Sequence, residues 1–313
     1  MKFVLSTSFS TVAHLTELAP VADTHGWHSM SFSDHVVNPA KINTPYPYTD
    51  DGSRRWQPFT DWPDPWVMIG ALSTITKRLR FTNNIFVLPM RNPYLTAKAI
   101  STAAIVSQNR VTAAFGVGWS RDEFELMAQD FSTRGKRTDE MLEIMRLLWT
   151  GEMVEYQGKY YQFSAMEMNP APSEPIPIWI GGISDPAMKR AARLGDGWVT
   201  DLQTSAEIIE SIERINNWRR EYGRDNELFE VMATPSDAWD VDGYKRLQDA
   251  GVSHFLTMPW PIYHGESEQL EHKIDGIKRY ADDNIARFDL LHRRHKMQMT
   301  QACEGKRGGH GRF

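Results

Sequence analysis

An aspartate and a histidine stand side by side where a short apolar run, residues 27–33, comes to an end. Asp34 and His35 directly follow this run, which we predict to be the second strand. A carboxylate and an imidazole offer complementary hydrogen-bonding groups near neutral pH, so the pair could hold a ligand and move a proton. An aspartate that caps a loop beside a solvated histidine would give the same pattern. We take Asp34 and His35 as candidate catalytic residues.

Two adjacent amide side chains interrupt the third predicted strand, residues 79–88. The run contains Thr82-Asn83-Asn84-Ile85, although asparagine is depleted in strands. Asn83 and Asn84 could hydrogen-bond the edge of a heteroaromatic ring, or they could satisfy a bulge in the sheet. The local sequence leaves both interpretations open.

Glycines follow the fourth and fifth predicted strands. After the fourth, Gly118 would let a ligand approach the backbone and Trp119 would supply an aromatic wall. After the fifth, Gly181 and Gly182 precede Ser184 and a helix, an arrangement whose backbone N–H groups can bind an anion. Tight packing between strand and helix, or an ordinary helix cap, explains the same glycines.

The elements that must position these residues alternate regularly along the chain. Strands are predicted over 2–9, 27–33, 79–88, 110–117, 176–180, 197–200, 228–233 and 252–257, each followed by a helical pattern. Eight such units predict an α/β fold, a (β/α)8 TIM barrel with insertions, whose site lies at the C-terminal ends of the strands. An open doubly wound sheet is the alternative, but Phe9-Ser10-Thr11 lacks the glycines of a dinucleotide fingerprint.

We predict one TIM-barrel domain over 1–286, with a long insertion and a tail. Segment 36–63 is rich in proline and aromatic residues and shows no periodicity, which favours a lid over the site. Segment 287–313 carries seven lysines and arginines against Asp289 and Glu304, and we expect it to be a basic, flexible tail.

Composition excludes several classes of protein. The 313 residues are 41% hydrophobic and 24% charged, as in ordinary folded chains, and the net charge of −5 argues against nucleic acid as a partner. No apolar run is long enough to span a membrane, and Met1–Leu5 is too short for a secretory signal. Cys303 is the single cysteine, and no metal-binding motif is present, so we expect a cytoplasmic protein without a metal site.

Taken in order, the motifs resemble those of the bacterial luciferase-like flavin monooxygenase superfamily. Within it, the chain is most similar to the actinobacterial subgroup of predicted coenzyme F420-dependent oxidoreductases. The resemblance covers residues 1 to about 286. Its motifs are Ser33-Asp34-His35, Tyr46-Pro47-Tyr48-Thr49-Asp50-Asp51-Gly52, Val87-Leu88-Pro89-Met90-Arg91-Asn92-Pro93, Gly116-Val117-Gly118-Trp119 with Glu123-Phe124, Arg134-Gly135-Lys136-Arg137-Thr138-Asp139-Glu140, Pro177-Ile178-Trp179-Ile180-Gly181-Gly182 and Ala191-Ala192-Arg193-Leu194-Gly195-Asp196-Gly197-Trp198.

The resemblance implies a barrel that binds F420 or FMN at the strand ends, with the catalytic pair beside the ring. It places a non-proline cis peptide at Asn84-Ile85, behind the ring. The residues it implies for cofactor binding are Asn83, Asn84, Ile85, Gly118, Trp119, Gly181, Gly182, Ser184, Thr200 and Asp201.

Three positions depart from the family pattern. Ala104 stands where relatives commonly carry aspartate, Asn109 where glycine is usual, and Asn83-Asn84 where a small-residue pair with glycine is usual. These departures concern the geometry of the pocket beside the third strand and leave the expected fold unchanged.

The leading functional hypothesis is an F420-dependent oxidoreductase. It would transfer a hydride between the deazaflavin C5 and a small, mainly apolar carbonyl, alcohol or enone, with His35 exchanging the proton. The alternative is an FMN-dependent monooxygenase that uses O2 and reduced flavin from a separate reductase. A non-catalytic flavin-binding barrel is a third interpretation. The expected partners are a small-molecule substrate and a second copy of the chain, with no membrane and no nucleic acid.

Overall fold

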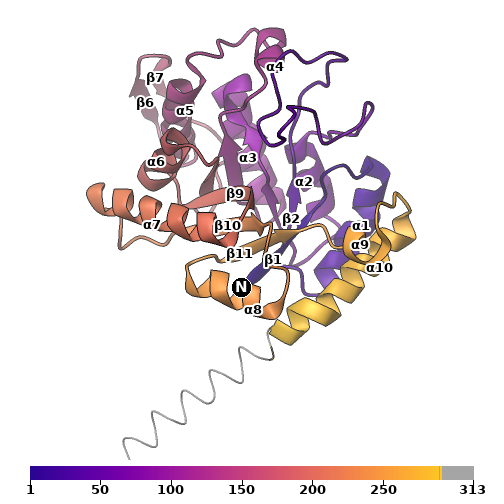
Figure 1. The fold of residues 1–313 in the computed structure, drawn as a ribbon. Coiled ribbons are helices and arrows are strands. Elements are labelled where there is room, and N and C mark those ends of the chain that lie inside the picture. The colour runs from indigo at the N-terminus through magenta and orange to yellow at the C-terminus, as the bar shows by residue number, and fades with distance from the viewer. Residues whose placement is uncertain (289, 291–313) are drawn as a thin grey trace, which may run out of the picture.

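Parallel strands close into a barrel in the computed structural model, which describes residues 1–288 and 290 (Figure 1). Their order is β3-β2-β1-β11-β10-β9-β8-β5-β4, and the two ends meet where Phe81 N donates to Arg110 O at 2.8 Å and Thr112 N donates to Phe81 O at 2.9 Å. The strands are β1 Lys2–Ser6, β2 Ser29–Phe32, β3 Arg80–Asn83, β4 Phe86–Val87, β5 Ala113–Gly116, β8 Ile178–Gly181, β9 Gly197–Gln203, β10 Glu230–Pro235 and β11 His254–Thr257. β3 and β4 are two parts of one interrupted strand, so the sheet corresponds to the eight strands of a TIM barrel. The predicted fold is confirmed.

Helices surround the barrel in the order expected of repeated strand–helix units (Figure 1). Those that alternate with the strands are α1 Val12–Thr24, α2 Pro65–Ser73, α3 Pro93–Val106, α5 Arg134–Leu148, α6 Asp185–Leu194, α7 Ser205–Glu221, α8 Val241–Asp249 and α10 Leu270–Tyr280. Additional elements are the 3₁₀ turn Leu88–Met90, α4 Arg121–Leu126, the hairpin of β6 Val154–Gln157 and β7 Gln162–Met166, α9 Trp260–His264, and a π-helical turn Ala281–Ala286. No helix among the residues described could cross a membrane.

The third strand is broken in the middle, so the expectation of one continuous strand over 79–88 is wrong. The Asn84-Ile85 peptide is cis, as the resemblance implies, and the strand resumes at Phe86. The Ile85 side chain then occupies the space beside two glycines of neighbouring strands. A Cβ on Gly116 would lie 1.7 Å from Ile85 Cδ1, and one on Gly181 would lie 2.7 Å from Ile85 Cγ2. Glycine is therefore required at both positions by close packing.

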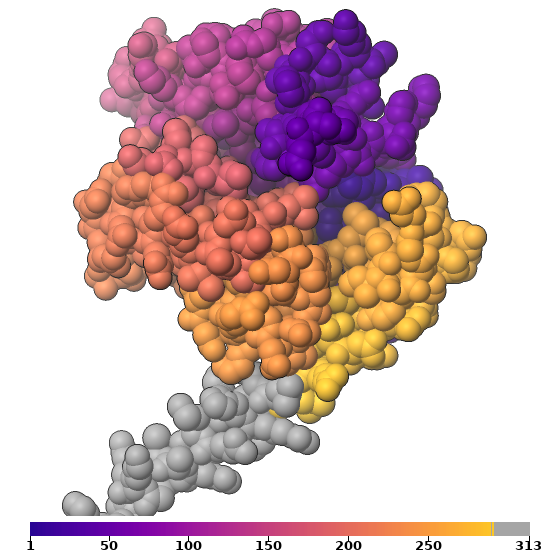
Figure 2. Space-filling view, viewed as in Figure 1, coloured from indigo at the N-terminus to yellow at the C-terminus, as the bar shows by residue number. Residues whose placement is uncertain are grey.

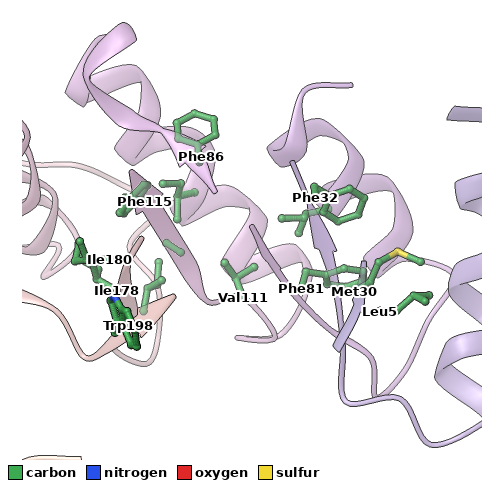
Figure 3. Close-up of a cluster of buried hydrophobic side chains, with 14 of the residues drawn as sticks. Leu5, Met30, Phe32, Phe81, Phe86, Val111, Phe115, Ile178, Ile180 and Trp198 are labelled. Carbon is green, nitrogen blue, oxygen red and sulfur yellow. The ribbon is translucent and has the colours of Figure 1, made fainter. Parts of the chain in front are cut away.

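Apolar side chains alternate between two buried layers, as the period of two along a strand dictates. Leu5 faces the helices and belongs to the large core around the barrel, while the adjacent Val4 faces inward. Figure 3 shows part of the outer core, with Phe32, Phe81 and Phe115 from successive strands. The inner layer consists of Val4, Ala114, Trp179, Val199, Met232 and Leu256, with Ile85 packed on it. This layer fills the barrel beneath the strand ends.

The helical turns after α10 reach beyond the predicted domain boundary at 286. Phe288 is buried, and its ring lies 6.0 Å from that of Phe3 and 6.4 Å from that of Tyr244. The outer core therefore includes Phe288. The rest of the predicted basic tail, 289 and 291–313, lies outside the described residues.

Two histidines, the buried His254 and the half-buried His28, lie at the opposite end of the barrel from the strand C-termini. The His28 and His254 rings are 5.1 Å apart, and the His254 ring also lies 4.7 Å from that of Trp179. Burial lowers the pKa of His28 to about 3 and that of His254 to about 2, and nearby positive charges act in the same direction. Both imidazoles are therefore neutral in the folded protein at physiological pH.

These histidines predict a loss of stability in mild acid. Unfolding returns each to an ordinary pKa near 6.5, so the unfolded chain binds more protons below that pH. The free energy of unfolding should be at its full value above about pH 7. Below pH 6.5 it should fall by about 1.4 kcal/mol per pH unit for each histidine.

Denaturant unfolding at pH 7.5, 6.5 and 5.5 measures this dependence. The variant His28→Gln should show a distinctly shallower slope than the wild type. His25→Gln, at the end of α1, serves as the matched control and should leave the slope unchanged. Equal slopes for His28→Gln and the wild type would show that the histidine pair does not cause the acid sensitivity.

Candidate active site

A cavity of about 870 Å³ opens at the C-terminal ends of the strands. The predicted site residues that line it are Asp34, His35, Asn84, Ile85, Gly118, Trp119, Gly181, Gly182, Ser184, Thr200 and Asp201. Asn83 does not reach it. Its side chain is fully buried on the same side of β3 as Phe81, which faces the helices. The structure thus gathers the predicted residues, apart from Asn83, around one space.

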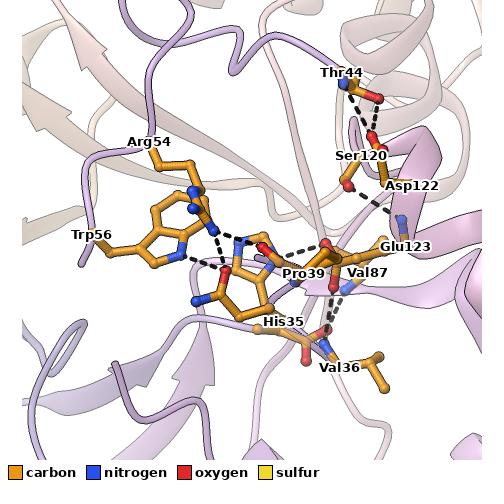
Figure 4. A network of polar contacts seen from close by, with 12 residues as sticks. His35, Val36, Pro39, Thr44, Arg54, Trp56, Val87, Ser120, Asp122 and Glu123 are labelled. Atoms are coloured by element: carbon orange, nitrogen blue, oxygen red, sulfur yellow. Dashed lines mark hydrogen bonds and ion pairs between the residues drawn. The ribbon is translucent and has the colours of Figure 1, made fainter. Parts of the chain in front are cut away.

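His35 is hydrogen-bonded to a buried glutamate that we did not predict as a site residue. His35 Nδ1 lies 2.7 Å from Glu123 Oε2, and the two side chains are 12% and 3% exposed (Figure 4). The other carboxylate oxygen, Oε1, accepts the Val36 N–H at 3.1 Å. With Nδ1 held by Glu123, Nε2 is the ring nitrogen left to exchange a proton with a ligand.

Glu123 is placed by the short helix α4 that follows β5. Ser120 caps this helix, its Oγ accepting the Glu123 N–H at 3.3 Å, so that Glu123 lies in the first turn. A carboxylate at this end is favoured by the helix dipole. The sequence signal was present, because Glu123 belongs to the motif after Trp119, but no local rule connects it with His35.

Asp34 anchors the broken third strand through hydrogen bonds, and its part in catalysis stays a prediction. Its Oδ1 accepts Arg91 Nη2 at 2.6 Å, and its Oδ2 accepts Arg91 Nη1 at 2.7 Å and the Val87 N–H at 2.8 Å. Burial raises the pKa of Asp34, and the Arg91 guanidinium acts against this. Three donors on its two oxygens favour the ionised form of the Asp34 carboxyl group. These hydrogen bonds also fix the position of the chain after β4.

Aromatic rings enclose His35 on the side of the insertion. The Trp56 and Trp62 rings each lie 4.7 Å from the imidazole, and the Trp119 ring lies 6.2 Å from it. Tyr46 closes the group, 5.3 Å from Trp56 and 5.1 Å from Trp119. The His35 side chain therefore lies in a largely aromatic part of the cavity wall.

The insertion 36–63 contains no helix or strand and is held down by polar contacts at several points. Its dark violet atoms lie at the surface of the molecule in Figure 2. On α4, Asp122 accepts the backbone N–H groups and side chains of Asn43 and Thr44 at 2.7–3.0 Å. These hydrogen bonds, that of the Thr44 hydroxyl first, hold the pKa of Asp122 well below its usual range. Arg54 Nη1 donates to Asn38 Oδ1 at 2.6 Å within the insertion. The insertion, which we expect to be a lid, is thus hydrogen-bonded to the barrel through α4.

Thr200 and Asp201 lie in the second half of β9, where the insertion contacts the barrel. Asp201 Oδ2 accepts Arg55 Nη2 at 3.1 Å, and the same guanidinium donates to Tyr46 Oη at 2.9 Å. The Thr200 hydroxyl donates to Gln203. Asp201 therefore holds the insertion at a second point.

The start of α6 has the features of a phosphate-binding turn. Ser184 precedes the helix, and no side chain caps its first N–H groups. Gly182 has φ +124°, and a Cβ there would lie 2.9 Å from Ala187 Cβ, so glycine is required. The Asp185 carboxylate is taken by Arg214 and so does not oppose an anion here. Uncapped amides beside a cavity fit the phosphate of a flavin or deazaflavin.

The comparison with known families agrees with this geometry. A sequence model of the family described as "Luciferase-like monooxygenase" matches residues 3–294. The chain belongs to this family.

Individual relatives narrow the chemistry to oxidoreductases. An uncharacterized protein of Mycobacterium tuberculosis is 35% identical over 290 residues, 92% of this chain and 100% of the relative. An F420-dependent glucose-6-phosphate dehydrogenase of Segniliparus rotundus is 27% identical over 273 residues, 84% of this chain and 76% of the relative. Among solved structures, an F420-dependent secondary alcohol dehydrogenase shares the fold, with a TM-score of 0.71, 18% identity, and 91% and 98% of the two chains covered. The prediction of an oxidoreductase of this family is confirmed.

Proposed function

We propose that this protein is an F420-dependent oxidoreductase acting on a small, mainly apolar carbonyl, alcohol or enone. The observation that carries the proposal is the contact between His35 and the buried Glu123 in the wall of the cavity at the strand ends. Relatives named as F420-dependent dehydrogenases support F420 as the cofactor. A homodimer and a cytoplasmic location belong to the same proposal.

Each part of the cavity has a task in this reaction. When bound, reduced F420 supplies a hydride from C5 to the carbonyl carbon or to the β-carbon of an enone. Ile85 and Trp119, which line the cavity, would hold the ring, and the α6 N–H groups with Ser184 would hold the phosphate. His35 Nε2 gives a proton to the substrate oxygen, or takes one from an alcohol in the reverse direction. Glu123 holds the imidazole in the orientation and tautomer that this transfer needs.

The charges around the cavity support an uncharged substrate. Among the lining residues described, Arg55 is the one lysine or arginine, and it is paired with Asp201. A sugar phosphate would require cationic donors that are free to bind it. The aromatic rings of Trp56 and Trp62 instead offer contact area to an apolar molecule.

A side-by-side binding titration tests the cofactor, using purified protein with F420 and with FMN. Tight F420 binding and weak FMN binding, followed by turnover of ketones, secondary alcohols or enones, would support the proposal. Preference for FMN would indicate a monooxygenase that receives reduced flavin from a separate reductase. Binding of either cofactor without turnover would indicate a non-catalytic barrel.

The positioning role of Glu123 predicts a selective loss of turnover. Glu123→Gln keeps the shape but removes the charge that orients His35, and we expect kcat to fall about 10- to 100-fold. The KM of the substrate and the Kd of F420 should change less than threefold. Glu125→Gln, on the exposed side of α4, is the matched control. Parallel losses of kcat and F420 affinity would indicate that Glu123 is merely structural.

A further inference from the structure

Two arginines stack on one aromatic ring beside the cavity without any acidic partner. The guanidinium carbons of Arg121 and Arg134 lie 4.6 Å and 3.7 Å from the Phe131 ring centre. No carboxylate of the described residues forms an ion pair with either. We call these three residues the arginine clamp.

The carboxylates near these arginines in sequence form no ion pair with them, and Asp122 and Glu123 accept hydrogen bonds from the insertion and from His35. Asp130 accepts the backbone N–H and hydroxyl of Ser132, and Asp139 pairs with Arg190 and Arg193. Glu125, one turn along α4 from Arg121, makes no ion pair with it. The positive charge of the arginine clamp is therefore not balanced locally.

The clamp also lies at the start of a helix, where positive charge is unfavourable. Arg134 is the first residue of α5, Lys136 and Arg137 follow within the first turn, and no acidic residue or side-chain cap is present there. The helix dipole disfavours cations at this end. Burial lowers the pKa of Arg134, and the charges of Arg121 and Arg190 lower it further. A bound anion would relieve both the repulsion and the unfavourable dipole interaction.

The position of the clamp relates it to the phosphate-binding turn. Arg134 Nε donates to the Gly118 carbonyl at 3.1 Å, and Gly118 lines the cavity. The next residue, Gly135, accepts Arg190 Nη2 of α6 at 2.9 Å. Arg190 is five residues from the start of α6, a rise of about 8 Å along the helix. The clamp thus lies beside both the cavity and the helix that would hold the cofactor phosphate.

We propose that the arginine clamp binds the carboxylate-bearing extension that continues beyond the phosphate of F420. FMN ends at its phosphate and has no group for this site, so the clamp would select the deazaflavin coenzyme over FMN. Guanidinium groups suit carboxylates because they donate parallel hydrogen bonds while their faces remain stacked on a ring. This inference rests on the proposed function, because it assumes that F420 is the cofactor.

Fluorescence binding titrations of the full chain test the clamp with three probes. The probes are F420 with its glutamate tail, F420 from which the glutamates have been removed, and FMN. Arg121 makes no hydrogen bond to another described residue and is exposed, so Arg121→Gln and Arg121→Glu leave the cavity wall intact. Arg279→Gln is the matched control, since Arg279 is also an exposed arginine stacked on an aromatic ring, that of Tyr263 at 4.3 Å.

We expect Arg121→Gln to raise the Kd of tail-bearing F420 about three- to fivefold and Arg121→Glu to raise it further. The same substitutions should change the Kd of FMN by less than about 1.5-fold, and their effect on the Kd of glutamate-free F420 should lie between the effects on the other two probes. Added salt should reduce the preference of the wild type for F420 that carries the glutamate tail. Unchanged F420 affinity in both variants, or an equal loss for FMN, would overturn the clamp alone. Failure of the wild type to bind F420 would overturn the proposed function and the clamp together.

Discussion

Replacing His35 by asparagine is expected to abolish most turnover while leaving the cofactor bound. Asparagine still offers Glu123 a hydrogen-bond donor, but it cannot exchange a proton with the substrate oxygen. General acid–base catalysis of this kind contributes about 10²- to 10⁴-fold, so kcat should fall by that factor. The measurement is single-turnover hydride transfer followed by the absorbance of F420, with the substrate found in the screen.

Two readouts separate this effect from a general disturbance of the cavity. The Kd of F420 should change less than threefold in His35→Asn, because the phosphate turn at α6 and the broken strand are untouched. His272→Asn, on α10 outside the cavity, should behave as the wild type. A His35→Asn enzyme that retains more than a tenth of the wild-type kcat would show that another group moves the proton.

The fold followed from patterns that are local in sequence. Alternating strand and helix periods predict the barrel because each unit buries its own apolar face against its neighbours. The ends of the strands then locate the site, and Gly118, Gly181 and Gly182 fall there because close packing demands them. Even the departure at Asn109 has a local reason. Its φ of +59° lies in the region that favours glycine and that asparagine tolerates.

The roles of individual side chains did not follow, because they depend on residues far apart in the chain. Arg91, 57 positions after Asp34, donates to both of its carboxylate oxygens, a contact that no local pattern predicts. Glu123 lies 88 positions from His35 and gains its role only when the strands close. Because side chains alternate along β3, the Asn83 side chain points away from the cavity, one residue before the cis peptide at Asn84-Ile85. Sequence patterns thus brought the candidate residues to one cavity, whereas their partners depend on tertiary contacts.

Removing the partner of Asp34 is expected to cost more stability than any exposed substitution. Arg91→Met keeps apolar contact with Phe86, over which the guanidinium lies at 4.1 Å, but leaves a buried carboxylate with the Val87 N–H alone. A buried charge that loses its partner typically destabilises a protein by about 3–5 kcal/mol. The free energy of unfolding at pH 7.5, obtained from denaturant titration, should fall by that amount.

The pH dependence distinguishes an unpaired charge from a simple packing defect. Burial raises the pKa of Asp34, and without Arg91 nothing of comparable strength opposes this shift. A folded-state pKa above the unfolded value means that the folded variant binds more protons, so its deficit relative to the wild type should narrow as the pH falls toward 5. Lys245→Met removes half of an exposed pair with Asp249 and should cost less than about 1 kcal/mol at either pH. If Arg91→Met is less stable than the wild type by the same amount at pH 7.5 and at pH 5, the loss of stability comes from packing. Asp34 would then have to be uncharged in the folded protein at both pH values.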